Sequence, residues 1–350
     1  MSLLGLLWWA SLAMGAASLL WMTWLIAARM VRARADRRLA KDQAFVRRCF
    51  LEIMEGRREA ARLLRAPARR ARLIAEAILD IAGLVRGQER DRLIAALSDL
   101  GVESRLQRRL TRGSRSGRVA AAEALAIFGA PQGAVILKQA MAASRDPDFR
   151  VAALNALLSF DEAPTLRELL SEVAAGGLQQ SLLYESVIRT IVARDPAGAI
   201  ELFGDPQTPL VSRTLIAEAL GRAGDYRAVP VLMHAVVDAD LELRIACIRA
   251  LGLLAHPVGA PAIATALGDE AWEVRAAAAE AAGRIGLIEL APSLVEALAD
   301  DAWWVRFRAG EALAACGEKG MAVLRLAAGV NQDVVRRAAS LVLAERGVAP

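Results

Sequence analysis

The hydrophobic pattern of the chain opens with a stretch that has no charged side chain. Residues 2–28 are mainly Leu, Ala, Trp, Met and Ile and contain no Lys, Arg, Asp or Glu. A helix over residues 3–28 would be roughly 39 Å long, enough to cross the ~30 Å hydrocarbon core of a bilayer with some tilt. Four tryptophans lie near its ends, where aromatic side chains often mark the membrane surface: Trp8, Trp9, Trp21 and Trp24. The pattern predicts a single transmembrane anchor at residues 1–28 and disfavours a helix buried in a soluble core.

Basic side chains follow this stretch and none precedes it. A cleaved signal peptide would place Lys or Arg before the apolar segment, so the arrangement favours a retained anchor. The positive-inside rule then puts the N-terminus outside and everything after residue 28 in the cytosol. A basic side chain beside the membrane adds about 1 kcal/mol of attraction to anionic lipid. The candidates for contact with lipid headgroups are Arg29, Arg32, Arg34, Arg37, Arg38 and Lys41. We therefore expect a single-pass protein of the inner (plasma) membrane.

Two helical regions are predicted between the anchor and residue 114. Residues 29–66 have the pattern of an arginine-rich juxtamembrane helix, in which positions beyond Lys41 contact either lipid or solvent. Pro67 interrupts that helix, because proline is tolerated in the first turn of a helix and not in its interior. Residues 67–113 then predict an atypical helical cap.

A repeated string of residues dominates the rest of the chain. Arginines at intervals of 32, 63, 31, 31 and 31 residues each begin a similar eight-residue segment rich in Ala and Leu: Arg118, Arg150, Arg213, Arg244, Arg275 and Arg306. The long interval holds one further copy, at 182–189, which lacks the arginine. A period near 31 residues predicts a stack of helical hairpins over residues 114–350, each with a first helix that ends at glycine or a turn and a second helix often opened by proline.

The repeat strings resemble a known family. Asp269-Glu-Ala-Trp-Glu-Val-Arg275 and Asp300-Asp-Ala-Trp-Trp-Val-Arg306 are similar to the HEAT-repeat superfamily, in its short class first associated with phycobilin lyases. The resemblance implies an all-α superhelix and says little about function, because the class serves many roles. Together with the anchor, it also makes the chain similar to bacterial membrane-tethered HEAT proteins, some of them associated with envelope polysaccharide synthesis. That likeness implies a subunit of an inner-membrane complex. We expect the partner to be an integral membrane protein, which the anchor pairs with while the solenoid binds its cytosolic domain.

Composition agrees with an all-α chain and argues against common catalytic sites. Apolar residues make up 55% of the chain and aromatic residues only 5%. The three cysteines are far apart, and neither of the two histidines lies one helical turn from a second His or Cys, so we expect no metal site and no cofactor. Charge is distributed unevenly along the chain, since residues 29–118 contain 24 Lys and Arg against 11 Asp and Glu, whereas residues 119–350 contain 20 against 28. The basic part follows the predicted anchor, and the acidic part is the predicted repeat array.

Enzymatic and nucleic-acid functions remain as alternatives. The deoxyhypusine hydroxylases, which are also HEAT-like, hold iron with His-Glu pairs; here His234 precedes Ala235 and His256 precedes Pro257, which excludes that activity. No GxxxxGK[ST], GxSxG or HExxH motif occurs. A bilin-lyase-like or other cryptic enzyme on the HEAT fold is one alternative, and a membrane-proximal nucleic-acid tether using the arginines of residues 57–118 is another. We expect the chain not to be an enzyme.

Acidic and basic residues recur in phase with the repeats. The pairs are Asp146/Arg150, Asp240/Arg244, Asp269/Arg275, and Asp300 or Asp301 with Arg306. We interpret them as structural: the acid caps a helix start, and the arginine bridges to the acid of the neighbouring repeat, forming a ladder.

A partner-binding surface is the remaining functional prediction. Three tryptophans stand just before the first helix of their repeats: Trp272, Trp303 and Trp304. We therefore expect them to lie along one edge of the solenoid. They either anchor a partner or, as we favour, are buried between repeats. We expect the second helices to line the concave side of the array. Further partner-binding candidates there are Lys138, Gln139, Arg167, Glu168, His234, Thr265, Glu296 and Arg325. The sequence thus predicts a membrane-tethered cytosolic scaffold that binds a protein partner.

Overall fold

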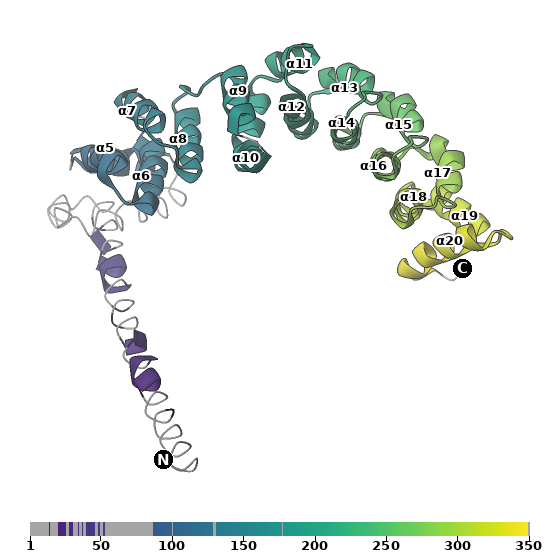
Figure 1. Ribbon diagram of the computed structural model, residues 1–350, viewed down its shortest axis with the longest axis horizontal. Helices are drawn as coiled ribbons and strands as arrows, with labels where there is room; N and C mark the ends of the chain where they lie inside the picture. The colour runs from purple at the N-terminus through teal and green to yellow at the C-terminus, as the bar shows by residue number, and fades with distance from the viewer. Residues whose placement is uncertain are drawn as a thin grey trace, which may run out of the picture. The chain divides into compact units, whose positions relative to one another are not determined.

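A computed structural model of the chain describes residues 14, 20–25, 28–30, 34, 37, 40–45, 48–49, 52, 87–99, 101–128, 131–176 and 178–348. The chain divides into two compact units, residues 1–162 and 163–350, and this division falls inside the predicted array of residues 114–350. Helices, with no strands, form all the regular structure in the described parts, which confirms the all-α prediction (Figure 1).

The predicted transmembrane anchor lies mostly outside the described residues. The described positions between residues 14 and 28 are helical, and Trp21 and Trp24 are exposed. No helix among the residues that the structure describes is both long and apolar enough to cross a membrane. The anchor at residues 1–28 and the helix at residues 29–66 therefore stay predictions.

The first unit packs short helices around a small apolar core. Its helices are α4 (Gln88–Asp99), α5 (Val102–Arg112), α6 (Arg115–Phe128), α7 (Pro131–Ala142) and α8 (Pro147–Ser159). Helix α5 packs on α6, and α6 packs on α8. Leu106, Leu110, Leu125 and Phe149 are fully buried among them. Helices α4 and α5 lie in the region predicted as a cap, although the boundaries at residues 67 and 113 stay predictions.

The second unit is a stack of helical hairpins, which confirms the predicted period. Its first helices are α10 (Leu178–Arg194), α12 (Leu210–Ala223), α14 (Leu241–Leu254), α16 (Trp272–Ile285), α18 (Trp303–Ala315) and α20 (Asp333–Glu345). Its second helices are α9 (Leu166–Gly176), α11 (Pro196–Gly204), α13 (Val229–Ala235), α15 (Ala260–Ala266), α17 (Ala291–Ala297) and α19 (Gly317–Ala328). Short 3-10 turns at 226–228, 257–259 and 288–290 lead into α13, α15 and α17. Proline occupies the first turn of each of these three helices, where its missing N–H costs nothing.

Glycine and alanine set the spacing of the first helices. A Cβ added to Gly221 would lie 2.6 Å from the Cα of Ala250, and one added to Gly283 would lie 2.7 Å from the Cα of Ala312. Gly252 meets Ala281 in the same way. Because only hydrogen separates the backbones at these points, α12, α14, α16 and α18 contact one another extensively, while the second helices contact one another little.

This spacing determines the curvature of the second unit. The closely packed row of first helices lies on the inner side, and α11, α13, α15 and α17 lie on the outer side (Figure 1). Our expectation that the second helices line the concave side is therefore wrong for this unit. His234 on α13, Thr265 on α15 and Glu296 on α17 are exposed on the outer row. The expectation failed because the alanine-rich first helices approach one another more closely than the second helices do, which places the first helices on the concave side.

The last repeat departs from this regular packing. At one period beyond Gly283 and Ala312 the chain has Ala314 and Leu343, which are larger. The close approach moves instead to Gly310, where an added Cβ would lie 2.6 Å from Cγ2 of Val342. Helices α18 and α20 contact each other less than α16 and α18 do, and α20 lies crosswise to the preceding first helices (Figure 1).

Candidate functional site

A ladder of ion pairs links consecutive repeats along one edge of the second unit. Each arginine in the first turn of a first helix meets an aspartate 25 residues later, in the loop before the next first helix. The pairs are Arg213 Nη1 with Asp238 Oδ2 at 3.3 Å, Arg244 Nε with Asp269 Oδ2 at 3.0 Å, and Arg275 Nε with Asp300 Oδ2 at 2.6 Å. The predicted bridge between neighbouring repeats is confirmed for Arg244 and Arg275, whereas Arg213 pairs with Asp238 and not with the predicted Asp240.

Each rung is also tied to the loop backbone. Arg275 Nη1 donates to the carbonyl oxygens of Asp269 at 2.8 Å and Glu270 at 3.0 Å, while Asp300 accepts a hydrogen bond from the N–H of Ala302 at 2.8 Å. Burial opposes ionisation of Asp300, but the hydrogen bonds from Arg275 and Ala302 outweigh it and lower the pKa of this carboxyl. The rung is therefore a charged structural joint between two repeats.

The predicted helix-capping role holds at some aspartates only. Asp240 accepts a hydrogen bond from the N–H of Leu243 at 2.9 Å, as an N-cap residue does. Asp146 makes no such side-chain bond to its own helix and pairs with Arg115 at 2.8 Å instead.

The ladder has an open end at Arg306. Its Nη1 donates to the carbonyl oxygens of Asp300 at 2.7 Å and Asp301 at 2.9 Å, as Arg275 does in its own loop. Val330 stands three residues before α20, where the other loops have aspartate, and Asn331 stands 25 residues after Arg306. Among the described residues, no carboxylate pairs with Arg306.

The three tryptophans lie at the starts of α16 and α18, as expected, and are substantially exposed. Trp272 is 41% exposed, Trp303 49% and Trp304 50%, so our favoured interpretation of them as buried contacts between repeats is wrong. Trp303 contacts the Trp304 ring edge-on at 4.7 Å between centroids and stacks on Phe307 at 5.2 Å. Phe307, one helical turn after Trp303, was not among the residues predicted from the sequence.

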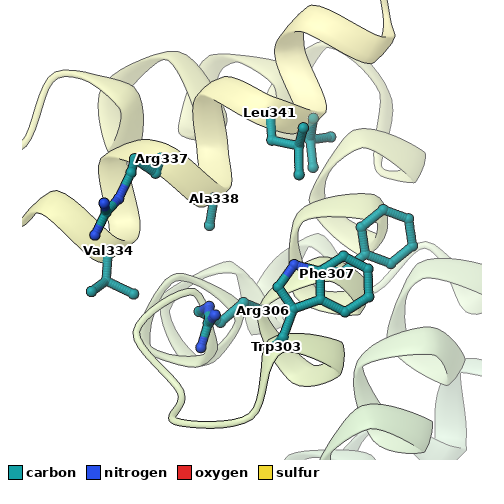
Figure 2. A pocket seen from close by; sticks show the side chains of 8 residues that line it. Trp303, Arg306, Phe307, Val334, Arg337, Ala338 and Leu341 are labelled. Carbon is teal, nitrogen blue, oxygen red and sulfur yellow. The ribbon is translucent and has the colours of Figure 1, made fainter.

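A pocket of about 240 Å³ opens between α18 and α20 (Figure 2). Trp303, Phe307 and Leu341 line one side of it, and Arg306, Arg337 and Val334 line the other (Figure 2). Val334 and Leu341 are 36% and 43% exposed. The α20 residues were not predicted from the sequence to belong to a site, since a pocket formed by two helices of neighbouring repeats depends on how those helices cross.

A second hollow of about 360 Å³ runs along the inner row. It is lined by the C-terminal parts of α12, α14 and α16, including Arg222, Arg249 and Arg284. Glu280 pairs with Arg284 at 2.7 Å and with Arg308 at 3.5 Å. Arg249 is exposed on α14.

The other predicted partner-binding residues are dispersed, and none of them lines the pocket between α18 and α20. Lys138 on α7 pairs with Glu162 at 2.5 Å, Arg167 on α9 with Asp205 at 3.3 Å, and Arg325 on α19 with Glu318 at 3.9 Å. Each of these residues is exposed, like His234 and Glu296. Their role in binding stays a prediction.

The predicted lipid-contacting residues are only partly described. Arg29, Arg34, Arg37 and Lys41 are exposed, whereas Arg32 and Arg38 lie outside the described residues.

Cysteine chemistry is restricted by burial. Cys49 and Cys247 are buried, and Cys316 is half-buried. Burial raises the pKa of Cys247 to about 12, so its thiol stays protonated at neutral pH. Within the described ranges, His, Cys, Asp and Glu side chains form no group that could hold a metal ion.

Comparison with known proteins identifies the repeats. Residues 199–270, 238–314 and 260–344 match the family model of HEAT repeats, the repeat class that the strings in this part of the sequence resemble. No curated protein sequence matches the chain.

The chain is similar in fold to a solved structure of importin beta. Importin beta is 15% identical, with a TM-score of 0.50, over 84% of this chain and 47% of the importin chain. Kap95p, in a structure with RanGDP, is 13% identical, with a TM-score of 0.47, over 86% and 50%. Human deoxyhypusine hydroxylase is 19% identical, with a TM-score of 0.26, over 83% and 96%. The chain spans about half the length of importin beta and of Kap95p. The likeness to importin beta shows the fold, a HEAT-like α-solenoid.

Proposed function

We propose that the chain is a scaffold, and not an enzyme, that binds a protein partner through its HEAT-repeat array. The observation that carries this proposal is the exposed aromatic edge formed by Trp272, Trp303 and Trp304 at the starts of two consecutive repeats. Covering a large apolar side chain contributes roughly 1.5–3 kcal/mol, and tryptophan and arginine dominate the binding energy of many interfaces. An edge with three such rings beside the arginine ladder has the composition of a binding surface.

We further propose that residues 1–28 hold this scaffold at the inner membrane, with the repeats in the cytosol. The uncharged stretch and the basic cluster that follows it support this placement. The partner would then be an integral membrane protein with a cytosolic domain, and anionic lipid would contact residues 29–41. The resemblance to membrane-tethered HEAT proteins makes a complex of envelope polysaccharide synthesis one setting for it.

Purification of the tagged full chain from detergent-solubilised membranes tests the scaffold proposal. We expect a stoichiometric protein partner with the wild type, and at least tenfold less of it with the double variant Trp303→Ala/Trp304→Ala. Tyr226→Ala is the matched control, since Tyr226 is an exposed aromatic residue, 58% accessible, in the turn before α13 and not at the start of a first helix. Recovery of the wild-type chain as a lone monomer would sink the proposal.

Deletion of residues 2–28 tests the membrane placement. The shortened chain should leave the membrane fraction, and a protein that remains wholly in that fraction would contradict the anchor. A C-terminal tag on the full chain should resist protease added to intact spheroplasts and be cleaved after lysis. Cleavage in intact spheroplasts would reverse the proposed orientation.

A further inference from the structure

The open rung at Arg306 leaves a guanidinium that is positioned but not neutralised. In the closed rung, Asp300 contacts Nε of Arg275 at 2.6 Å and Nη2 at 2.9 Å. Arg306 is held by the same two loop carbonyl bonds from Nη1, and its Nε and Nη2 meet no acceptor among the described residues. This edge of a guanidinium matches a carboxylate in two parallel hydrogen bonds. The next repeat supplies none, because Val330 and Asn331 stand where the aspartate would be.

A second arginine faces the same pocket. Arg337 Nε donates to the carbonyl oxygen of Asp333 at 3.2 Å, whereas the Asp333 carboxylate is taken by Arg336. The pocket therefore has two arginines without a carboxylate partner in the described chain. Residues 119–350 have more acidic than basic side chains, so this is a local positive site and not part of a generally basic surface.

Apolar groups lie one helical turn from each arginine. On α18, Trp303 precedes Arg306 by three residues, and on α20 Val334 and Leu341 flank Arg337 at three and four residues. Phe307 is the residue after Arg306 and lies one helical turn after Trp303. These side chains line one pocket (Figure 2). Half-exposed tryptophan beside unpaired arginine is the composition of an interface anchor point.

The size of the pocket favours a segment of a protein over a metabolite. Its volume of about 240 Å³ lies below the roughly 300–1,000 Å³ usual for small-molecule sites. It is large enough for one or two side chains and open enough for the rest of a chain to pass over it.

We infer that this pocket binds an acidic segment of a protein partner, in which Asp or Glu lies next to a large apolar residue. The carboxylate completes the ladder by accepting hydrogen bonds from Nε and Nη2 of Arg306, and the apolar side chain packs on Trp303 and Phe307. The inference rests on the proposed scaffold function and names the surface and the chemistry that the partner uses.

Peptide binding to the full chain in detergent micelles tests this inference. The probe is a fluorescein-labelled peptide, Gly-Ser-Asp-Phe-Glu-Leu-Ser-Gly, compared by fluorescence anisotropy with the same peptide carrying Asn and Gln in place of Asp and Glu. We expect the acidic peptide to bind at least about tenfold more tightly, since only its carboxylates pair with the arginines. Equal binding of the two peptides would overturn the inference.

Variants of the chain locate the site. Arg306→Gln and Arg337→Gln should each weaken binding of the acidic peptide about tenfold, while Arg249→Gln, at an exposed arginine of the inner row, should change it less than twofold. Val330→Asp keeps Arg306 and supplies an internal carboxylate, so it should also weaken binding about tenfold in a folded protein. Full affinity in both Arg306→Gln and Val330→Asp would contradict the inference.

Two readouts separate this inference from the scaffold proposal. If the copurifying partner is retained equally by wild type and Arg306→Gln, the inference fails and the scaffold stands. If Arg306→Gln instead abolishes a concentration-dependent dimer seen by sedimentation, the pocket binds a second copy of the chain and the inferred occupant is wrong. If the wild type has no partner, the scaffold proposal fails whatever the peptide does.

Discussion

The interfaces among α12, α14, α16 and α18 differ from the interface between α18 and α20 in two ways. The earlier ones bring glycine against alanine and join each arginine to an aspartate of the next repeat. The last one has Ala314 and Leu343 at the corresponding positions, and it has no aspartate for Arg306. A small change of side-chain volume and one missing carboxylate thus accompany a crosswise helix and an open pocket. An open pocket is therefore found in this array where the repeat pattern fails.

The largest expected effect comes from filling a close approach in the regular interfaces. Gly221→Ala places a Cβ 2.6 Å from the Cα of Ala250, which is backbone and must shift, so we expect about 3 kcal/mol of destabilisation. Gly204→Ala is the control, since a Cβ there meets nothing within 4 Å, and it should stay within about 0.5 kcal/mol of the wild type. Urea unfolding followed by circular dichroism measures both. Similar stability of the two variants would remove the packing half of the comparison.

The next effect compares a closed rung with the open one. Arg275→Ala leaves the largely buried Asp300 without its ion pair and should cost about 2 kcal/mol. Arg306→Ala loses only bonds to carbonyl oxygens and should cost about 1 kcal/mol. The same unfolding experiment distinguishes them, and an equal cost would mean that the carboxylate adds nothing to a rung.

The smallest effect is the dependence of a rung on pH. Because the folded-state pKa of Asp300 is lowered, its ionisation stabilises the fold above the unfolded pKa of about 4, and this stability is lost as the pH falls through the folded pKa. Asp300→Asn should therefore be less stable than the wild type at pH 7 by about 1 kcal/mol, with a difference that shrinks below about pH 4. Urea midpoints at pH 7 and pH 3 give the test. A difference that does not change with pH would show that ionisation of Asp300 does not stabilise the rung.

Much of the fold could be predicted because each repeat contacts mainly its neighbours. The spacing of Arg244, Arg275 and Arg306 gave the period, and the prolines at 230, 261 and 292 marked the second helices. The ladder followed from the same phase, since an arginine and an aspartate repeated with one period must meet at every interface or at none.

The candidate site could be predicted only in part. Trp303 was identified from its position, but its exposure was misjudged, because the sequence does not show whether the next repeat covers it. Phe307 and Leu341 were missed, since each has the pattern of an ordinary apolar position in a helix. Phe307 and Leu341 line a pocket only because α20 lies crosswise to the preceding first helices.

The sequence by itself determined the helical hairpins, their period and the presence of a ladder, because those depend on residues a fixed number of positions apart. The tertiary structure decided which row of helices lies on the concave side and where a pocket forms between two first helices. Both outcomes depend on how closely whole helices approach, which sums the volumes of many side chains and is not a property of any one repeat. The uncharged N-terminal stretch predicts an anchor on composition alone, whereas the pocket beside Arg306 required the packing of two helices.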